Sequence, residues 1–147
     1  MQFEFSILVS ASAEKIFALY ADVPNWPQWD PDVKAVSIDG PFVSGATGVV
    51  EPHGGPKSKL VFTNVVANKS FSAQCKLPLC TMRFDHTLQA EGSQTKVTHG
   101  VVFEGFLAPL FGRLIGSGMR KSLPKALQQL KLTAQGDRAP ATSRSVA

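Results

Sequence analysis

The start of the chain alternates between apolar and polar positions. In residues 2–10 nearly every second position is apolar, which is typical of a strand with one buried face. A helix should follow, because Ser12 is a suitable N-cap and apolar residues recur at helical spacing up to Tyr20. Pro24 disfavours helical geometry at Val23 and predicts that this helix ends near Asp22.

The middle of the chain reads as short strands separated by glycine, proline and serine. The segment NWPQWDP is too rich in proline for a long helix, and we expect a short turn-like helix with Trp26 and Trp29 folded onto the body. The predicted strands cover residues 33–38, 46–51, 58–66, 69–76, 80–90 and 94–105.

From Phe106 to Thr133 the apolar spacing becomes helical. The first apolar stripe comprises Leu107, Leu110, Phe111, Leu114, Ile115 and Gly118, and the second comprises Met119, Leu123, Ala126, Leu127 and Leu130. The two stripes lie about a third of a turn apart, at ~100° per residue. Together with Pro124, this shift predicts a long helix that bends between about Gly116 and Pro124.

This order of elements predicts an α+β fold: β, α, short α, six strands, then a long helix. We expect the chain to form one domain over residues 1–135, in which a curved antiparallel sheet wraps the C-terminal helix. Residues 136–147 lack apolar periodicity and are expected to be a disordered tail.

Several stretches resemble the START-like, helix-grip superfamily (SRPBCC), which includes polyketide cyclases and dehydrases and lipid-transport proteins. The similar stretches are ASAEKIFALYADVPNWPQWDPDVKAV, LVFTNVVANKSF and FDHTLQAEGSQTKVTHGVVFEGFLAPL. The resemblance covers residues 3–133 and implies a seven-stranded sheet gripping the C-terminal helix, with a cavity between them. It names no ligand, because members of the superfamily include enzymes, carriers and regulators.

Two histidines occupy the apolar faces of the last two predicted strands. A four-residue turn at 91–94 pairs Ala90 with Thr95, and this register sets His86 opposite His99. Directly paired side chains have Cβ atoms ~5 Å apart. Three interpretations remain open: core histidines satisfied by neighbours, hydrogen-bonding groups for a ligand, or catalytic acid/base groups. Arg83 and Asp85 are predicted to point away from this face.

The inward faces of the strands and the first helical stripe supply the other candidate ligand-binding residues. The full predicted set is Phe62, Phe71, Met82, Phe84, His86, His99, Val101, Phe103, Leu107, Phe111 and Leu114. Ordinary core packing is the competing interpretation for each single residue. Trp26 and Trp29 either gate the cavity or fasten the short helix.

The two cysteines lie on neighbouring predicted strands. A turn at 76–79 would pair Cys75 with Cys80. We favour two adjacent reduced thiols over a strained cross-strand disulfide, because MQFEFSILVS lacks the basic start of a secretory signal. A cytoplasmic location is therefore expected.

Charge is distributed unevenly along the 147 residues. Residues 1–52 carry a net −5 and the remainder a net +9, within a total of +4. Arg113, Arg120 and Lys131 share one helical face, which predicts either a solvated face or docking to an anionic membrane or an acidic carrier protein. No compact basic run indicates nucleic acid.

The sequence contains no phosphate loop, GxSxG, HExxH, or iron–sulfur or haem spacing, so we expect no cofactor and no metal. Our first hypothesis is binding or transport of a hydrophobic small molecule, such as a lipid, polyketide or isoprenoid, between sheet and helix. The alternatives are a cyclase or dehydratase that uses His86 and His99, and a docking module that uses the basic helix. Without a residue predicted to orient the histidines, binding is favoured over catalysis.

Overall fold

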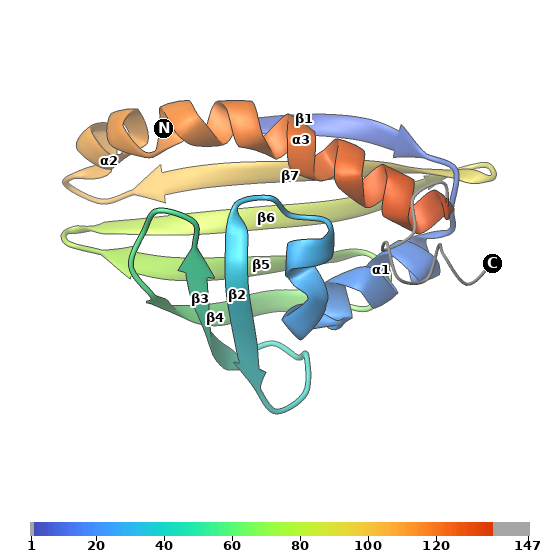
Figure 1. Ribbon diagram of the computed structural model, residues 1–147, viewed down its shortest axis with the longest axis horizontal. Helices are drawn as coiled ribbons and strands as arrows, with labels where there is room; N and C mark the ends of the chain where they lie inside the picture. The colour runs from blue at the N-terminus through green and yellow to red at the C-terminus, as the bar shows by residue number, and fades with distance from the viewer. Residues whose placement is uncertain (1, 137–147) are drawn as a thin grey trace.

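The computed structural model describes residues 2–136. The chain forms a seven-stranded antiparallel sheet and places a long C-terminal helix across one face of it (Figure 1). The strands are β1 (Gln2–Val9), β2 (Val33–Asp39), β3 (Thr47–Pro52), β4 (Ser58–Val66), β5 (Ser70–Leu77), β6 (Cys80–Glu91) and β7 (Gln94–Glu104). The helical segments are α1 (Ala13–Ala21), the 3₁₀ helix η1 (Val23–Gln28), α2 (Ala108–Leu114) and α3 (Gly116–Gln135). The predicted helix-grip α+β fold is confirmed.

The order of strands in the sheet is β1-β7-β6-β5-β4-β3-β2. The chain therefore runs as a meander from β2 to β7, and β1 then pairs with β7 at the far edge. Two irregularities interrupt the ladder, between Val33 and Ala35 in β2 and between Thr63 and Val66 in β4. Asn64 lies in the second of these with φ of 50°, and bulges of this kind bend a strand and increase its twist.

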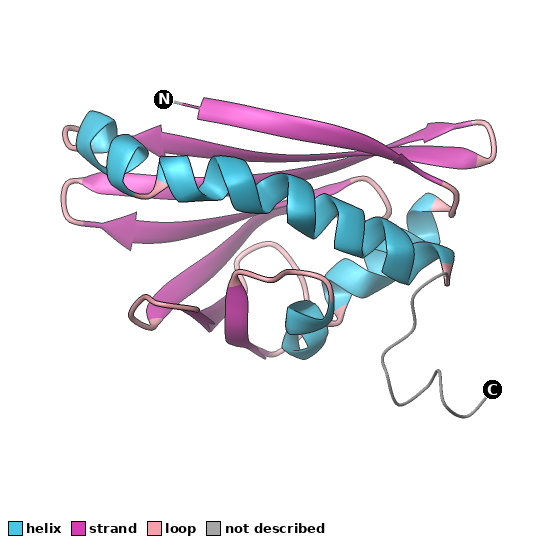
Figure 2. Ribbon diagram, turned by 45° about the horizontal axis from the view of Figure 1, so that its top comes forward, coloured by secondary structure: helices cyan, strands magenta, loops and turns pink. Residues whose placement is uncertain are grey.

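Both ends of α1 follow the expected local rules. The Ser12 side chain accepts a hydrogen bond from the Lys15 amide at 3.1 Å, and the helix ends at Ala21, before Pro24. The short helix η1 then buries Trp26 and Trp29 against the body, and the Trp26 indole donates to the Tyr20 carbonyl at 2.9 Å. Figure 2 shows α1 and η1 beside the C-terminal half of α3, on the face of the sheet that α3 crosses.

The C-terminal helix differs from its prediction in where it is interrupted. The break lies at Ile115, one residue before the predicted interval, and α3 runs without interruption through Pro124. Gly116 packs at this junction against Phe3 and Phe103, since a Cβ there would lie at ordinary contact distances of 3.5 and 3.7 Å from their rings. Residues Leu123, Ala126, Leu127 and Leu130 of the second stripe are buried as predicted.

The first stripe does not form one buried face, because the break changes the direction of α2. Leu107 and Phe111 pack onto the core around Val101 and Phe103, whereas Leu110 and Leu114 are 48% and 67% exposed. The predicted tail at 136–147 lies almost wholly outside the described residues; Gly136 ends α3 in the left-handed conformation. Among the helices of residues 2–136, none combines the length and apolar character needed to cross a membrane.

Candidate functional site

A cavity of about 550 Å³ lies between the sheet and α3. The sheet lines it through β4, β5, β6 and β7, and the helix lines it through residues from Ile115 to Ala126. The remaining wall comes from η1, the segment that follows it, and the β3–β4 loop around His53. Most of the lining side chains are apolar, as expected for a small-molecule site.

The histidine pair forms as strand alternation predicts. Ala90 pairs with Thr95, and His86 pairs with His99 across β6 and β7. The centroids of the two imidazole rings are 4.5 Å apart, and their planes meet at 67°. Both histidines line the cavity.

Tyr20 contacts the pair from the opposite layer. Its hydroxyl lies 2.8 Å from Nε2 of His99, within hydrogen-bond distance, and its ring is fully buried. The Tyr20 ring centroid also lies 5.5 Å from that of His86. The α1 helix therefore supplies the orienting residue that sequence reasoning lacked. The one sequence feature that could have drawn attention to Tyr20 is that it is the only tyrosine in the chain.

Two further aromatic rings complete this group, which we call the histidine cluster: Tyr20, Trp29, Phe71, His86 and His99. Phe71 stacks on His86 with ring centroids 3.9 Å apart and planes only 8° apart. Trp29 lies on the other side, 5.9 Å from His99 between ring centroids. The two imidazoles are thus held by aromatic side chains from α1, η1–β2 and β5.

Two nitrogen atoms of the cluster are buried without a hydrogen-bond partner among residues 2–136. They are Nδ1 of His86 and Nε1 of Trp29. A buried, unpaired polar group costs about 1–3 kcal/mol, so proteins seldom keep one without a reason such as a bound water or a ligand. Both residues line the cavity, which makes this cluster its candidate polar end.

Burial controls the ionisation of the cluster. It lowers the pKa of His86 to about 4 and holds the pKa of His99 well below 6.5, with the neighbouring His86 adding to the effect on His99. Burial also raises the pKa of Tyr20 well above 10. All three side chains are therefore neutral at pH 7, and they offer hydrogen bonds rather than charge.

Asp30 places one carboxyl group in the cavity wall. One of its oxygens accepts a hydrogen bond from the Asp32 amide at 3.0 Å, and none of the described residues forms an ion pair with it. Desolvation raises the pKa of Asp30 to about 6. Asp30 and Trp29 were not among the predicted ligand-binding residues, although NWPQWDP had drawn attention to this segment.

The structure brings four of the predicted site residues to the cavity: Met82, Phe84, His86 and His99. The other seven lie elsewhere among the described residues. Phe62 and Phe71 are fully buried in the aromatic core around Trp26. Val101 and Phe103 are buried in a separate apolar cluster with Cys80, Ala108 and Leu123, and Leu107 and Phe111 pack onto it. Leu114 is 67% exposed.

The predicted pairing of the cysteines is wrong. Cys75 pairs with Met82, and Cys80 pairs with Leu77, because the β5–β6 turn has two residues, Pro78 and Leu79, rather than four. Leu79, the second residue of this turn, follows Pro78 and adopts a φ of 54°, the combination found in type II turns. Both cysteines are buried free thiols, and burial raises the pKa of Cys75 to about 11.

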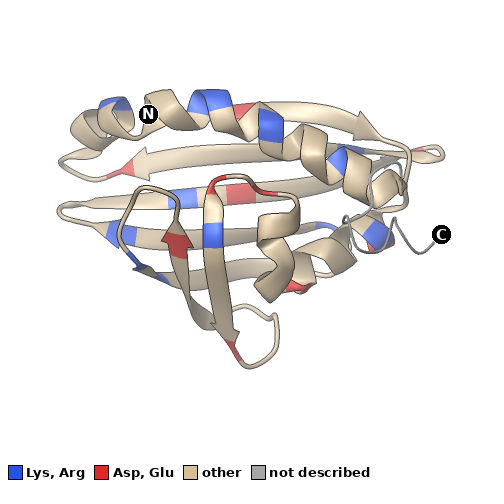
Figure 3. Ribbon diagram, in the orientation of Figure 1, with Lys and Arg blue, Asp and Glu red and all other residues tan. Residues whose placement is uncertain are grey.

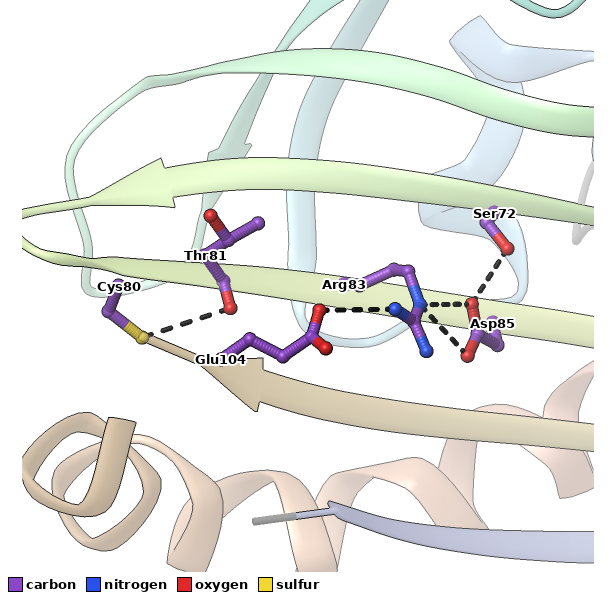
Figure 4. A network of polar contacts seen from close by, with 6 residues as sticks. All are labelled: Ser72, Cys80, Thr81, Arg83, Asp85 and Glu104. Atoms are coloured by element: carbon purple, nitrogen blue, oxygen red, sulfur yellow. Dashed lines mark hydrogen bonds and ion pairs between the residues drawn. The ribbon is translucent and has the colours of Figure 1, made fainter. Parts of the chain in front are cut away.

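Arg83 and Asp85 lie on the opposite face of β6 from the cavity, as predicted. Figure 4 shows Arg83 between Asp85 and Glu104, at 3.0 and 3.2 Å, and Ser72 donating to Asp85 at 2.7 Å. These four residues form an outer network that is separate from the histidine cluster. Within residues 2–136, no group of three or more His, Cys, Asp or Glu side chains is placed to hold a metal ion.

Solved structures of several proteins share this architecture. Protein MLL2253 from Mesorhizobium loti has a TM-score of 0.74 at 18% identity, covering 95% of this chain and 99% of that one. The di-domain aromatase/cyclase BexL of the BE-7585A biosynthetic pathway has a TM-score of 0.70 at 18% identity, covering 89% and 45%. Norcoclaurine synthase from Thalictrum flavum, in complex with dopamine and hydroxybenzaldehyde, has a TM-score of 0.69 at 13% identity, covering 95% and 89%. At these identities the likeness shows the fold alone.

Sequence comparison extends the match to a family. An uncharacterized protein of Bacillus subtilis, YdcF, is 37% identical over 49 residues, which are 33% of this chain and 50% of that protein. This chain therefore matches about half the length of that curated relative. The family model described as "Polyketide cyclase / dehydrase and lipid transport" matches residues 1–135. The chain therefore belongs to the polyketide cyclase/dehydrase and lipid transport family.

Proposed function

We propose that this protein binds a hydrophobic small molecule of the lipid, polyketide or isoprenoid kind in the cavity between the sheet and α3. The observation that carries the proposal is the cavity itself, of about 550 Å³ and walled mostly by apolar side chains. This volume lies within the range of about 300–1,000 Å³ typical of small-molecule sites. The family description supports the same class of ligand.

The histidine cluster suggests how such a ligand is oriented. Neutral imidazole and indole groups can bond a hydroxyl or carbonyl oxygen, and both His86 and Trp29 keep an unpaired nitrogen. An apolar molecule with one neutral oxygen-bearing group would place that group at the cluster and its apolar body against Met82, Phe84 and α3. A ligand oxygen would then satisfy polar atoms that the protein leaves unpaired.

The second candidate function is a cyclase or dehydratase reaction at the same cluster. The hydrogen bond between Tyr20 and His99 favours it, because it orients one imidazole beside the other. A pKa of about 4 makes His86 a weak base at neutral pH, where a general base works best with a pKa near the working pH. The cluster is therefore better suited to polarising a ligand oxygen than to moving a proton, and we place binding first.

The experiment fills the cavity and measures binding. Ala73 is 3% exposed and lines the cavity, and its neighbour Gln74 points to the other face of β5. In a titration with N-phenyl-1-naphthylamine, a neutral apolar fluorophore, Ala73→Phe should abolish the fluorescence increase and Gln74→Phe should preserve it. Circular dichroism and thermal unfolding check that both variants fold.

Native mass spectrometry of the freshly purified protein is the companion measurement, and a co-purified apolar molecule is the expected result. If folded Ala73→Phe protein bound the fluorophore as the wild type does, the cavity would not be the binding site. To separate the two candidate functions, any molecule identified should be incubated with wild type and His99→Gln. Conversion to a product by the wild type alone would favour the enzyme.

A further inference from the structure

A group of large apolar side chains lies in solvent at one end of the molecule. The exposed fraction is 83% for Phe106, 67% for Leu79, 67% for Leu114 and 48% for Leu110. None of these four lines the cavity described above. Scattered exposed apolar residues are ordinary, but a contiguous patch marks an interaction surface.

These four residues come from two segments that are in contact. The Leu107 amide donates to the Leu79 carbonyl at 3.0 Å, which fixes the β5–β6 turn against the start of α2. The two segments touch so closely that a Cβ on Gly105 would lie 2.7 Å from the same carbonyl oxygen. Leu110 and Leu114 are four residues apart in α2 and are therefore neighbours on its surface, and Phe106 lies in the turn that leads into α2. We call Leu79, Phe106, Leu110 and Leu114 the α2 patch.

Two exposed basic residues are close in sequence to members of the α2 patch. Arg113 is exposed and neighbours Leu110 on the helix surface, and Lys76 is exposed three residues before Leu79. The segment 105–136 carries five Lys or Arg residues and no acid. Figure 3 shows these cations in blue along α2 and α3, with no red on either helix. The nearest acid in sequence, Glu104, is paired with Arg83 at 3.2 Å.

We propose that the α2 patch docks the protein onto the surface of an anionic lipid bilayer. Exposed Phe and Leu side chains flanked by cations match such a surface, because the apolar groups enter the acyl boundary and the cations meet the headgroups. Neither helix beside the patch carries an acid, which favours the anionic headgroups of a bilayer over a second folded protein as the occupant.

The patch adjoins the cavity. Leu77 and Ile115 line the cavity, and they are close in sequence to Leu79 and Leu114 of the patch. Docking would bring this end of the cavity to the bilayer, where apolar molecules are concentrated. A docked protein would take its ligand from the bilayer or deliver it there, which rests on the binding proposed above.

The experiment is flotation of the full chain with vesicles of phosphatidylcholine, either alone or with about 30% phosphatidylglycerol to supply the anionic charge. The wild type should float with the anionic vesicles and not with the neutral ones. Binding should fall when salt rises from about 0.05 to about 0.5 M, because salt screens the attraction between exposed charges.

Variants identify the surface. Phe106→Ser and Leu110→Ser should each weaken binding to anionic vesicles about tenfold, through lost apolar burial. Arg113→Gln should weaken it about fivefold, as expected for one cation near a charged surface. The matched control is Val66→Ser, because Val66 is 46% exposed and far from the patch. Val66 ends β4 just before β5 begins, whereas Leu79 follows the opposite end of β5.

Three results would overturn the inference. The first is equal or absent binding to the two kinds of vesicle, and the second is equal weakening by Leu110→Ser and Val66→Ser. The third is that the protein does not bind vesicles and instead forms a complex, with itself or with a carrier protein, that Leu110→Ser disperses. All variants should still bind N-phenyl-1-naphthylamine, so a failure of docking leaves the cavity proposal standing.

Discussion

The histidine pair, in which His99 is buried and His86 is half-buried with its Nδ1 atom enclosed, makes the stability of this protein depend on pH between about 4 and 7. The pKa of His86 is about 4 in the folded protein, against ~6.5 for an unperturbed histidine. The unfolded chain therefore binds more protons than the folded one in this interval. Stability is fully present above the unfolded pKa and is lost as pH falls towards the folded pKa.

The magnitude follows from the two pKa values of His86. Between pH 7 and pH 5 this side chain alone should remove about 2 kcal/mol from the free energy of unfolding. Burial and the neighbouring His86 also lower the pKa of His99, so His99 acts in the same direction. Asp30 acts in the opposite direction, because a raised pKa stabilises the fold at low pH, and it should return about 1 kcal/mol. His86 and Asp30 together should therefore lower the free energy of unfolding by about 1 kcal/mol, and His99 adds to this loss.

Urea denaturation at pH 7 and pH 5 measures this loss, with the fluorescence of Trp26 and Trp29 as the signal. Both tryptophans are buried, and they are the only two in the chain. His86→Gln removes one titrating group, so the stability gap between wild type and variant should narrow by about 2 kcal/mol on moving from pH 7 to pH 5. His53→Gln is the matched substitution outside the histidine cluster, because His53 is exposed. Parallel pH dependences for wild type and His86→Gln would refute the burial of this imidazole.

Two further substitutions test the packing around the site. Tyr20→Phe should lower the free energy of unfolding, measured by urea denaturation, by about 2 kcal/mol, because it leaves buried His99 without its partner at 2.8 Å. Ser6→Ala is the control: it removes an exposed hydrogen bond to Thr98 and should lower the free energy of unfolding by less than about 0.5 kcal/mol. Gly105→Ala should lower the melting temperature and reduce the free energy of unfolding by about 2 kcal/mol or more. The φ of Gly105 is 118°, and a Cβ there would lie 2.7 Å from the Leu79 carbonyl oxygen. Gly118→Ala has open space and a helical backbone and should be neutral or stabilising; equal losses at the two glycines would contradict the close contact.

Local patterns were sufficient to predict most of the elements and the pairing of the two histidines. Strand side chains alternate with a period of two, so the apolar positions of β6 and β7 decided which face His86 and His99 occupy. The length of the turn between Glu91 and Gln94 then decided their register. The N-cap at Ser12 and the end of α1 followed for the same reason, since both depend on neighbouring residues alone.

The cysteine pairing shows where local reasoning fails. Leu77 continues β5 and only Pro78 and Leu79 turn, so the register moved by two residues from the predicted one. Pro78 indicates a turn, but Leu77 before it is compatible with strand and turn alike, so the sequence does not show which residue ends the strand. The favoured ending depends on contacts made after folding, such as the hydrogen bond from Leu107 to Leu79.

Only the tertiary structure decided the composition of the site and of the α2 patch. Tyr20 and His99 are 79 residues apart, and their contact depends on how α1 packs over the sheet. Helical periodicity showed that Leu107, Leu110, Phe111 and Leu114 recur at helical spacing, but it could not show that a break at Ile115 turns α2 and leaves Leu110 and Leu114 exposed. A periodic pattern indicates which residues share a face, whereas the direction of that face is determined by the packing of the whole chain.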